Sequence, residues 1–160
     1  MLAVTIPVDY DNLIACFPAP NAAAELPFGA RKKGGRHVAT ATFVWPTSLS
    51  CETRFKFAGD GSVGPMNPDD SAAVATIATL GLDNEDLAEL RAQAVISSGL
   101  VRVASAPLSA AAARRLAEKV CQPASNGYCE PFCVALQQVA LACAEKEERR
   151  AARLRKKPAP

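Results

Sequence analysis

The stretch EPFCVALQQVALACAEKEERRAARLRKKPAP, residues 130–160, decides how the rest of the chain is organised. Pro131 stands where the first turn of a helix tolerates proline. Apolar side chains then recur at helical spacing, at Phe132, Leu136, Val139 and Cys143. The pattern predicts a core helix from Pro131 to Cys143.

After Cys143 the apolar stripe stops and the charge changes from acidic to basic. Six cations follow the glutamates of this segment, at Arg149, Arg150, Arg153, Arg155, Lys156 and Lys157. A second basic cluster, next to His37 and interrupted by two glycines, contains Arg31, Lys32, Lys33 and Arg36. Two basic segments on either side of an acidic middle predict contact with a polyanion, and RNA or DNA backbone is the partner we favour.

A chain of 160 residues, 49% hydrophobic and 21% charged, is typical of one globular domain. Aromatic residues make up only 6%, and alanine is frequent. Helices with small side chains bury little area each, which favours assembly with copies of itself or with other subunits.

We expect neither a secretory signal nor a membrane span in this chain. Residues 1–8 lack a preceding positive region, and the longest apolar run is interrupted by Gln137 and Gln138. We therefore expect a soluble intracellular protein without membrane contact, either cytoplasmic or inside a virion or large particle, with reduced cysteines.

The amino half is predicted to hold an arm and two strands. Proline and glycine recur through residues 1–36, which favours an extended arm with a short strand at 2–8 and a helical turn at 21–26. Alternating side chains at 37–45 and 52–58 predict two antiparallel strands. The triplet Gly59-Asp60-Gly61 then predicts a turn with positive φ.

The carboxy half changes to helical periodicity. Asp69 or Asp70 caps a helix at 71–80 that Gly81 stops. Asp83 or Asn84 caps the next helix, to about Ser97, with an inward stripe of Leu87, Leu90 and Ala94. A short strand at 100–104 comes next. Ser109 then caps a helix at 110–121, whose inward residues are Ala112, Ala113, Leu116 and Val120.

These elements predict an α+β fold, with a small antiparallel hairpin or sheet packed on three or four helices. The organisation we expect is an irregular Pro/Gly-rich arm at 1–36 with its basic loop, a single domain at 37–147 and a basic tail at 148–160.

The segment Gly59-Asp60-Gly61-Ser62-Val63-Gly64 matches the dinucleotide-binding pattern G-x-G-x-x-G. Such a site needs its third glycine at the start of a helix, where free amide groups hold the pyrophosphate. Here two prolines intervene, and the next helix begins at two aspartates. We interpret the segment as a glycine turn and expect no cofactor.

Four cysteines lie in the last third of the chain, at Cys121, Cys129, Cys133 and Cys143. Cys129 and Cys133 are spaced for half a zinc site, but the other half is poorly supplied. The spacing of Cys133 and Cys143 resembles one half of the twin-cysteine helix hairpins, and the second half differs. The interpretation we favour is that Cys133 and Cys143 are small buried apolar residues, which leaves free, disulfide-bonded and metal-bound states open.

The sequence offers no convincing catalytic group, since His37 is the only histidine and it lies in a basic run. The paired acids lie where helix capping explains them. We therefore predict a non-enzymatic subunit of a nucleoprotein particle, such as a viral coat-like or ribonucleoprotein component. The alternative is a small monomeric adaptor or regulator that binds an acidic protein through its terminal helix.

Overall fold

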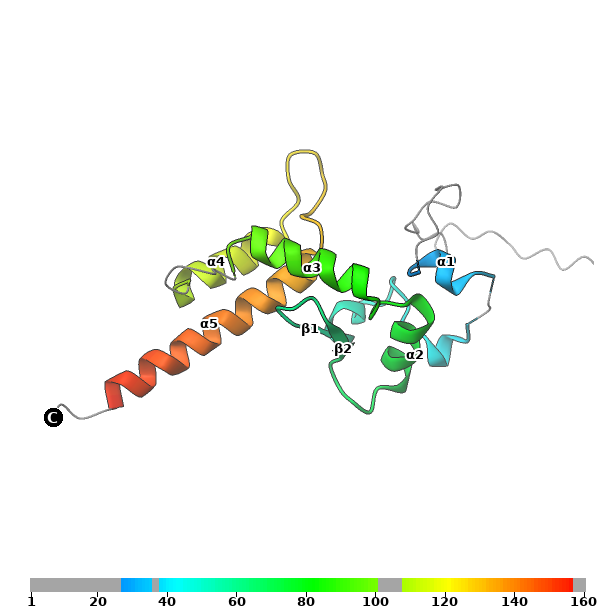
Figure 1. The fold of residues 1–160 in the computed structure, drawn as a ribbon, viewed down its shortest axis with the longest axis horizontal. Coiled ribbons are helices and arrows are strands. Elements are labelled where there is room, and N and C mark those ends of the chain that lie inside the picture. Colours follow the sequence, from blue (N-terminus) through cyan, green and yellow to red (C-terminus); the bar gives the residue numbers. More distant parts are fainter. Residues whose placement is uncertain (1–26, 36–37, 101–107, 157–160) are drawn as a thin grey trace, which may run out of the picture.

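The computed structural model describes residues 27–35, 38–100 and 108–156. In chain order its elements are α1 (Ala30–Lys33), η2 (Thr40–Thr42), η3 (Cys51–Arg54), β1 (Phe55–Phe57), β2 (Val63–Pro65), α2 (Ser71–Leu80), α3 (Glu85–Ser97), α4 (Ala110–Val120) and α5 (Cys133–Lys156) (Figure 1). A small antiparallel sheet in the first half and helices in the second half confirm the predicted α+β class.

The helix boundaries follow from local capping. Helix α2 begins after Asp70, whose carboxylate accepts a hydrogen bond from the Ala73 amide at 3.0 Å, and ends at Gly81 in the left-handed conformation. Asn84 caps α3 and Ser109 caps α4 in the same manner. These starts were predicted correctly because a cap is a short-range signal.

The predicted strand at 37–45 is wrong over the described residues 38–45. These form the short 3-10 helix η2 followed by irregular chain, and the neighbouring side chains Phe43 and Val44 are both buried. Neighbouring residues of a strand point to opposite faces, so this burial does not fit a half-buried strand. The Val44 amide donates instead to Thr76 Oγ1 of α2, at 2.8 Å.

The second predicted strand exists but is shorter and has a different partner. Strand β1 pairs antiparallel with β2, with Lys56 opposite Gly64. The connection between them is the glycine segment, and Gly61 there has a φ of 83°, which confirms the predicted turn. Since this segment joins two strands and opens no helix, it lacks the geometry of a dinucleotide site.

Two groups of buried side chains form the interior. The first joins α3, α4 and α5 through Val95, Leu100, Ala117, Val120, Leu136, Val139 and Ala140. The second lies between η2, β1 and α2 and contains Val44, Phe55, Ala72, Ala73 and Ile77. The residues are mostly small, so the helices approach one another closely.

Two polar side chains connect the hairpin to the helices. Gln138 of α5 accepts from the Phe57 amide at 3.0 Å and donates to the Phe55 carbonyl at 2.9 Å. Arg91 of α3 donates to the carbonyls of Gly61 and Leu82, at 3.1 and 2.9 Å. Gln138 satisfies backbone groups of β1, and Arg91 satisfies one carbonyl of the hairpin turn and one that follows α2.

Arg91 also corrects the predicted inward stripe of α3. Leu90 is 52% exposed, whereas Arg91 is only 4% exposed and its guanidinium lies 5.4 Å from the centre of the Phe57 ring. Burial lowers the pKa of this arginine. An arginine takes the inward position because carbonyl oxygens from distant segments accept hydrogen bonds from its guanidinium.

The beginning of the described chain packs on α2. Phe28 is buried, and the Gly29 amide donates to the Leu80 carbonyl at 2.7 Å. Residues 27–35 of the predicted arm are thus attached to the domain. The strand predicted at 2–8, the helical turn at 21–26 and residues 101–104 of the strand predicted at 100–104 lie outside the described residues.

Among the described residues, no helix combines the length and the apolar character needed to cross a membrane.

Candidate polyanion-binding surface

Helix α5 is one continuous helix that contains both the apolar residues of the core and most of the basic segment. Its 24 residues correspond to a length of about 36 Å. It begins at Cys133, two residues later than predicted, because Phe132 adopts a left-handed φ of 59° that ends the preceding turn. The predicted stripe is confirmed at Leu136 and Val139, which are buried against α3 and α4.

The basic end of α5 extends beyond the helix that supports it. Arg114 of α4 makes a bidentate ion pair with Glu148, with nitrogen–oxygen distances of 2.9 and 3.0 Å. Because the two helices run antiparallel, α4 continues only four residues past this pair, to Ala110. The α5 residues after about position 152 therefore project past the end of α4, as the red end of the ribbon shows (Figure 1).

The arginines of this end divide into paired and unpaired groups. Arg149 pairs with Glu145 at 2.8 Å, and Arg150 pairs with Glu147 at 3.6 Å. Neither Arg153 nor Arg155 has an acidic partner among residues 27–35, 38–100 and 108–156. The structure thus leaves the two arginines beyond the end of α4 without an acidic partner among the described residues, as it does Lys146 nearer the middle of the helix.

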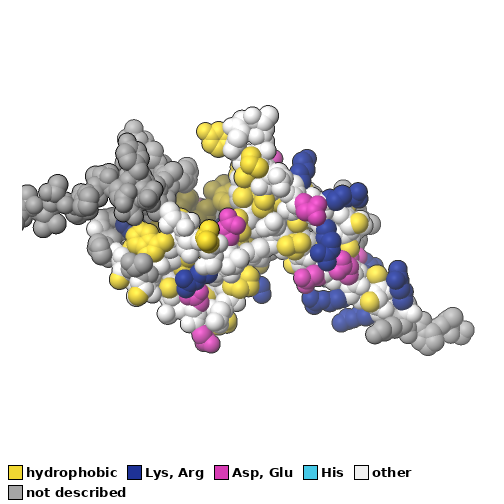
Figure 2. All heavy atoms as spheres, turned by 180° about the vertical axis from the view of Figure 1, so that it is seen from behind, with side chains coloured by type: hydrophobic (Ala, Val, Ile, Leu, Met, Phe, Trp, Pro, Cys, Tyr) yellow, Lys and Arg dark blue, Asp and Glu magenta, His cyan; other side chains and the backbone are white. Residues whose placement is uncertain are grey.

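The remaining predicted cations of the tail are less defined. Lys156 is the last residue of α5, and Lys157 lies outside the described residues. Figure 2 shows that lysine and arginine side chains gather over this end of the molecule, with acidic side chains between them. The surface is therefore mixed in charge near Glu145 and basic only towards its tip.

One apolar side chain projects from the basic end. Leu154 is 67% exposed. It follows the buried Leu136 by eighteen residues, which is five helical turns, so it continues the face that lies in the core. No described residue covers it, because α4 ends before this position.

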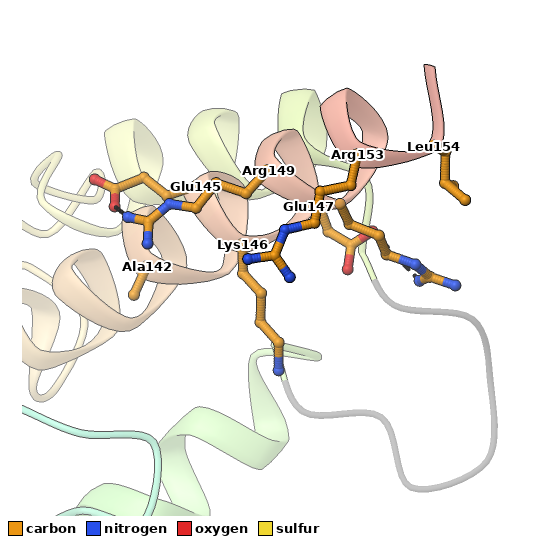
Figure 3. A pocket seen from close by; sticks show the side chains of 8 residues that line it. Ala142, Glu145, Lys146, Glu147, Arg149, Arg153 and Leu154 are labelled. Atoms are coloured by element: carbon orange, nitrogen blue, oxygen red, sulfur yellow. Dashed lines mark hydrogen bonds and ion pairs between the residues drawn. The ribbon is translucent and has the colours of Figure 1, made fainter. Parts of the chain in front are cut away.

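A surface hollow of about 940 Å³ follows the same part of α5 (Figure 3). Its described lining consists of Ala142, Glu145, Lys146, Glu147, Arg149, Arg150, Arg153 and Leu154. All of these belong to one helix, and a single helix is convex. The described part of the lining is therefore an open surface that suits an extended partner better than a small molecule.

The first basic cluster lies elsewhere. Helix α1, which contains Arg31, Lys32 and Lys33, packs near α2 at the opposite end of the molecule from the tip of α5 (Figure 1). Lys32 passes over the end of α2, since a β-carbon on Gly81 would lie 2.6 Å from its Cδ. Arg36 lies outside the described residues. The structure does not bring the two basic segments together.

The cysteines and His37, which were considered as metal ligands or catalytic groups, form no such site among the described residues. Cys51, Cys121, Cys129, Cys133 and Cys143 are free thiols. No group of three or more potential metal ligands converges in the part of the chain that the structure describes. His37 is outside that part.

The acidic partners of the basic segment were not predicted from the sequence. Glu145 precedes Arg149 by four residues and Glu147 precedes Arg150 by three, which is the spacing of side-chain pairs on one helix. This signal was present in the sequence. Among the described arginines at the end of α5, Arg153 and Arg155 are therefore the two without an acidic partner.

Comparison of the chain with known protein families, curated proteins and solved structures gives no match.

Proposed function

We propose that the protein is a non-enzymatic subunit of a nucleoprotein assembly and that the tip of α5 contacts nucleic-acid phosphates. The observation that carries the proposal is the projection of Arg153 and Arg155 past the end of α4, with no acidic partner among the described residues. Phosphate contacts of this kind need cations on an accessible, convex element and no base readout.

Two further features support the proposal. The rigid attachment of α5 through Leu136 and Val139 fixes where the cations stand relative to the domain. Residues 133–160 contain no aromatic side chain, so we expect affinity for the phosphate backbone with little sequence preference.

The test is a titration of fluorescently labelled RNA and DNA by fluorescence anisotropy at several salt concentrations. Replacing both arginines, R153Q with R155Q, removes two phosphate contacts and lowers the slope of log affinity against log salt by about 1.8 for a duplex. The matched control is R115Q with K119Q, which removes two exposed cations from α4.

An equal loss in the control variant would show that only overall charge matters. Absence of any salt-dependent affinity in the unmodified protein would overturn the proposal. Light scattering after size-exclusion chromatography tests the assembly part, since a strictly monomeric protein contradicts a structural subunit.

The second candidate is an adaptor that binds an acidic protein, and the exposed Leu154 favours it. A leucine surrounded by arginines suits a partner helix with an apolar stripe and acidic flanks. The variant L154Q separates the two functions, because it leaves phosphate contacts unchanged and removes the apolar anchor of a protein partner.

A further inference from the structure

Three thiols meet where α4 ends and α5 begins, far from the basic tip. Cys121 follows the last residue of α4, Cys133 is the first residue of α5, and Cys129 lies in the loop between them. The Cys121 thiol donates to the Cys133 carbonyl at 3.7 Å, and the Cys129 thiol donates to the Cys121 carbonyl at 3.6 Å. Cys143 is ten residues further along α5, about 15 Å along the helix axis, and packs against the core instead.

We propose that Cys121 and Cys133 are a redox pair that forms a disulfide across the base of the α4–α5 hairpin. The Cys121 sulfur lies 3.7 Å from the Cys133 carbonyl oxygen, which places the two cysteines side by side where the helices meet. Cys121 and Cys133 are half-buried, and each stands at the end of a helix that fixes its backbone. Cys129 also has its sulfur at the backbone of Cys121, but it is exposed and lies in the connecting loop.

The chemistry is thiol–disulfide exchange with a low-molecular-weight disulfide such as oxidised glutathione. One protein thiolate attacks a sulfur of the oxidant, giving a mixed disulfide and one released thiol. The second protein thiolate then displaces the remaining half of the oxidant. The protein loses two electrons and two protons, and the oxidant becomes two thiol molecules.

Two features of the structure act on the reduced pair: the burial of Cys121 and the backbone conformation of Phe132. Burial raises the pKa of the Cys121 thiol, and the nearby Cys133 thiol raises it further. The Cys121 thiol is therefore mostly protonated in the reduced protein, and its exchange is slow compared with that of an exposed thiol. Phe132, immediately before Cys133, holds a left-handed φ of 59°, so the loop enters the helix through a strained residue.

The test is equilibration of the full chain with reduced and oxidised glutathione, followed by alkylation and mapping of the linked peptides. Trypsin leaves all four carboxy-terminal cysteines in one peptide, because no lysine or arginine occurs between Lys119 and Lys146. A second digestion with chymotrypsin, after Tyr128 and Phe132, separates Cys121, Cys129 and Cys133.

The expected result is a linked Cys121–Cys133 pair, a mass loss of two hydrogen atoms and a rise in Tm of about 5 °C on oxidation, since the bridge closes a short loop. C133S abolishes both changes, and C143S leaves them intact. Recovery of Cys129 in the linked pair, or of fully reduced thiols under oxidising glutathione, overturns the proposal. If C133S folds poorly, the variant C129S tests the proposal instead. It keeps Cys121 and Cys133, so the expected bridge should still form, whereas a bridge that involves Cys129 would be lost.

Discussion

Gly61 is the residue at which the hairpin turn meets α3. Its φ of 83° suits glycine, and a β-carbon there would lie 1.8 Å from the Ala88 carbonyl oxygen and 2.9 Å from the Ala92 amide nitrogen. Both obstacles are backbone atoms, which do not rotate away. The turn can therefore touch the helix only because no side chain stands between them.

We predict that G61A destabilises the protein by at least about 3 kcal/mol, because strain in φ and a backbone collision act together. The measurement is urea unfolding followed by circular dichroism. Two control glycines separate the causes. Gly99 has a φ of 78° but open space, so G99A costs only about 1 kcal/mol, and Gly64 has neither feature, so G64A is nearly neutral. Similar losses for all three variants would contradict the role of the collision.

Asp70 serves two partners at once. Its carboxylate accepts from Arg54 Nε at 2.7 Å and also bonds to Arg54 Nη2, and it caps α2 through the Ala73 amide. The hydrogen bond to Arg54 is the main cause that lowers the pKa of this carboxyl from 3.8 to about 2, with the amide as the next cause. The residue thus joins η3 to the start of α2.

A carboxyl with a lowered pKa in the folded state stabilises the protein above its ordinary pKa, and this contribution is lost as the pH falls from about 4 towards 2. D70N keeps the helix cap but loses the ion pair. We therefore expect D70N to have a lower Tm than the unmodified protein at neutral pH and the difference to shrink over that acidic range. D69N, which changes the exposed neighbour, has no such effect, and an unchanged difference at low pH would refute the assignment.

At the scale of elements, Gln138 extends the two-stranded sheet. Its amide accepts from one residue of β1 and donates to another, as a neighbouring strand does. A single hairpin is marginally stable by itself, and its free edge is unpaired. Helix α5 therefore holds the sheet edge as well as the helical core.

We predict that Q138A costs about 2 kcal/mol, because the Phe57 amide and the Phe55 carbonyl both lose their partner. Q138E retains the acceptor and loses the donor, so its cost at neutral pH should approach that of alanine. Q137A is the control, since the adjacent side chain makes only a long contact of 3.5 Å with the Ala117 carbonyl. Chemical denaturation measures all three, and equal effects at the two glutamines would argue against the role in the sheet.

The elements that the sequence predicts well are those defined by neighbouring residues. Helix α2 has the predicted bounds because Asp70 and Gly81 mark its ends directly. The strand predicted at 37–45 is wrong over the described residues 38–45, because the partner of the Val44 amide is Thr76, far along the chain, which the alternation of side chains does not indicate. The inward side of α3 was wrong for the same reason, since the acceptors of Arg91 lie in other segments.

At the scale of the whole molecule, the described chain consists of two buried groups joined by α5 and α3, with a helix end that projects from one of them. The sequence indicated the basic segments as candidate contacts. It could not show that they lie at opposite ends, because their separation depends on how α1 packs on α2 and α5 on α4. Pairing within α5 was visible in the spacing, whereas the pairing of Glu148 with Arg114 was not.

We predict that a chain ending at Ala152 keeps the fold, because the described side chains it loses, Arg153, Leu154 and Arg155, are all exposed. Its Tm should stay within about 2 °C of that of the full chain, since surface changes of this kind rarely matter. Nucleic-acid affinity should fall at the same time. A large loss of Tm in differential scanning calorimetry would show that the tip supports the fold.

The continuous helix α5 has a consequence for the thermodynamics of any contact at its tip. A basic tail without fixed structure loses conformational entropy when a partner orders it, and this loss reduces the affinity. The backbone of α5 is already helical to Lys156, so that within the described residues of the helix the side chains, and not the backbone, have freedom left to lose. Binding to phosphate should then be accompanied by a heat-capacity change close to zero, as for two preformed surfaces that meet without folding.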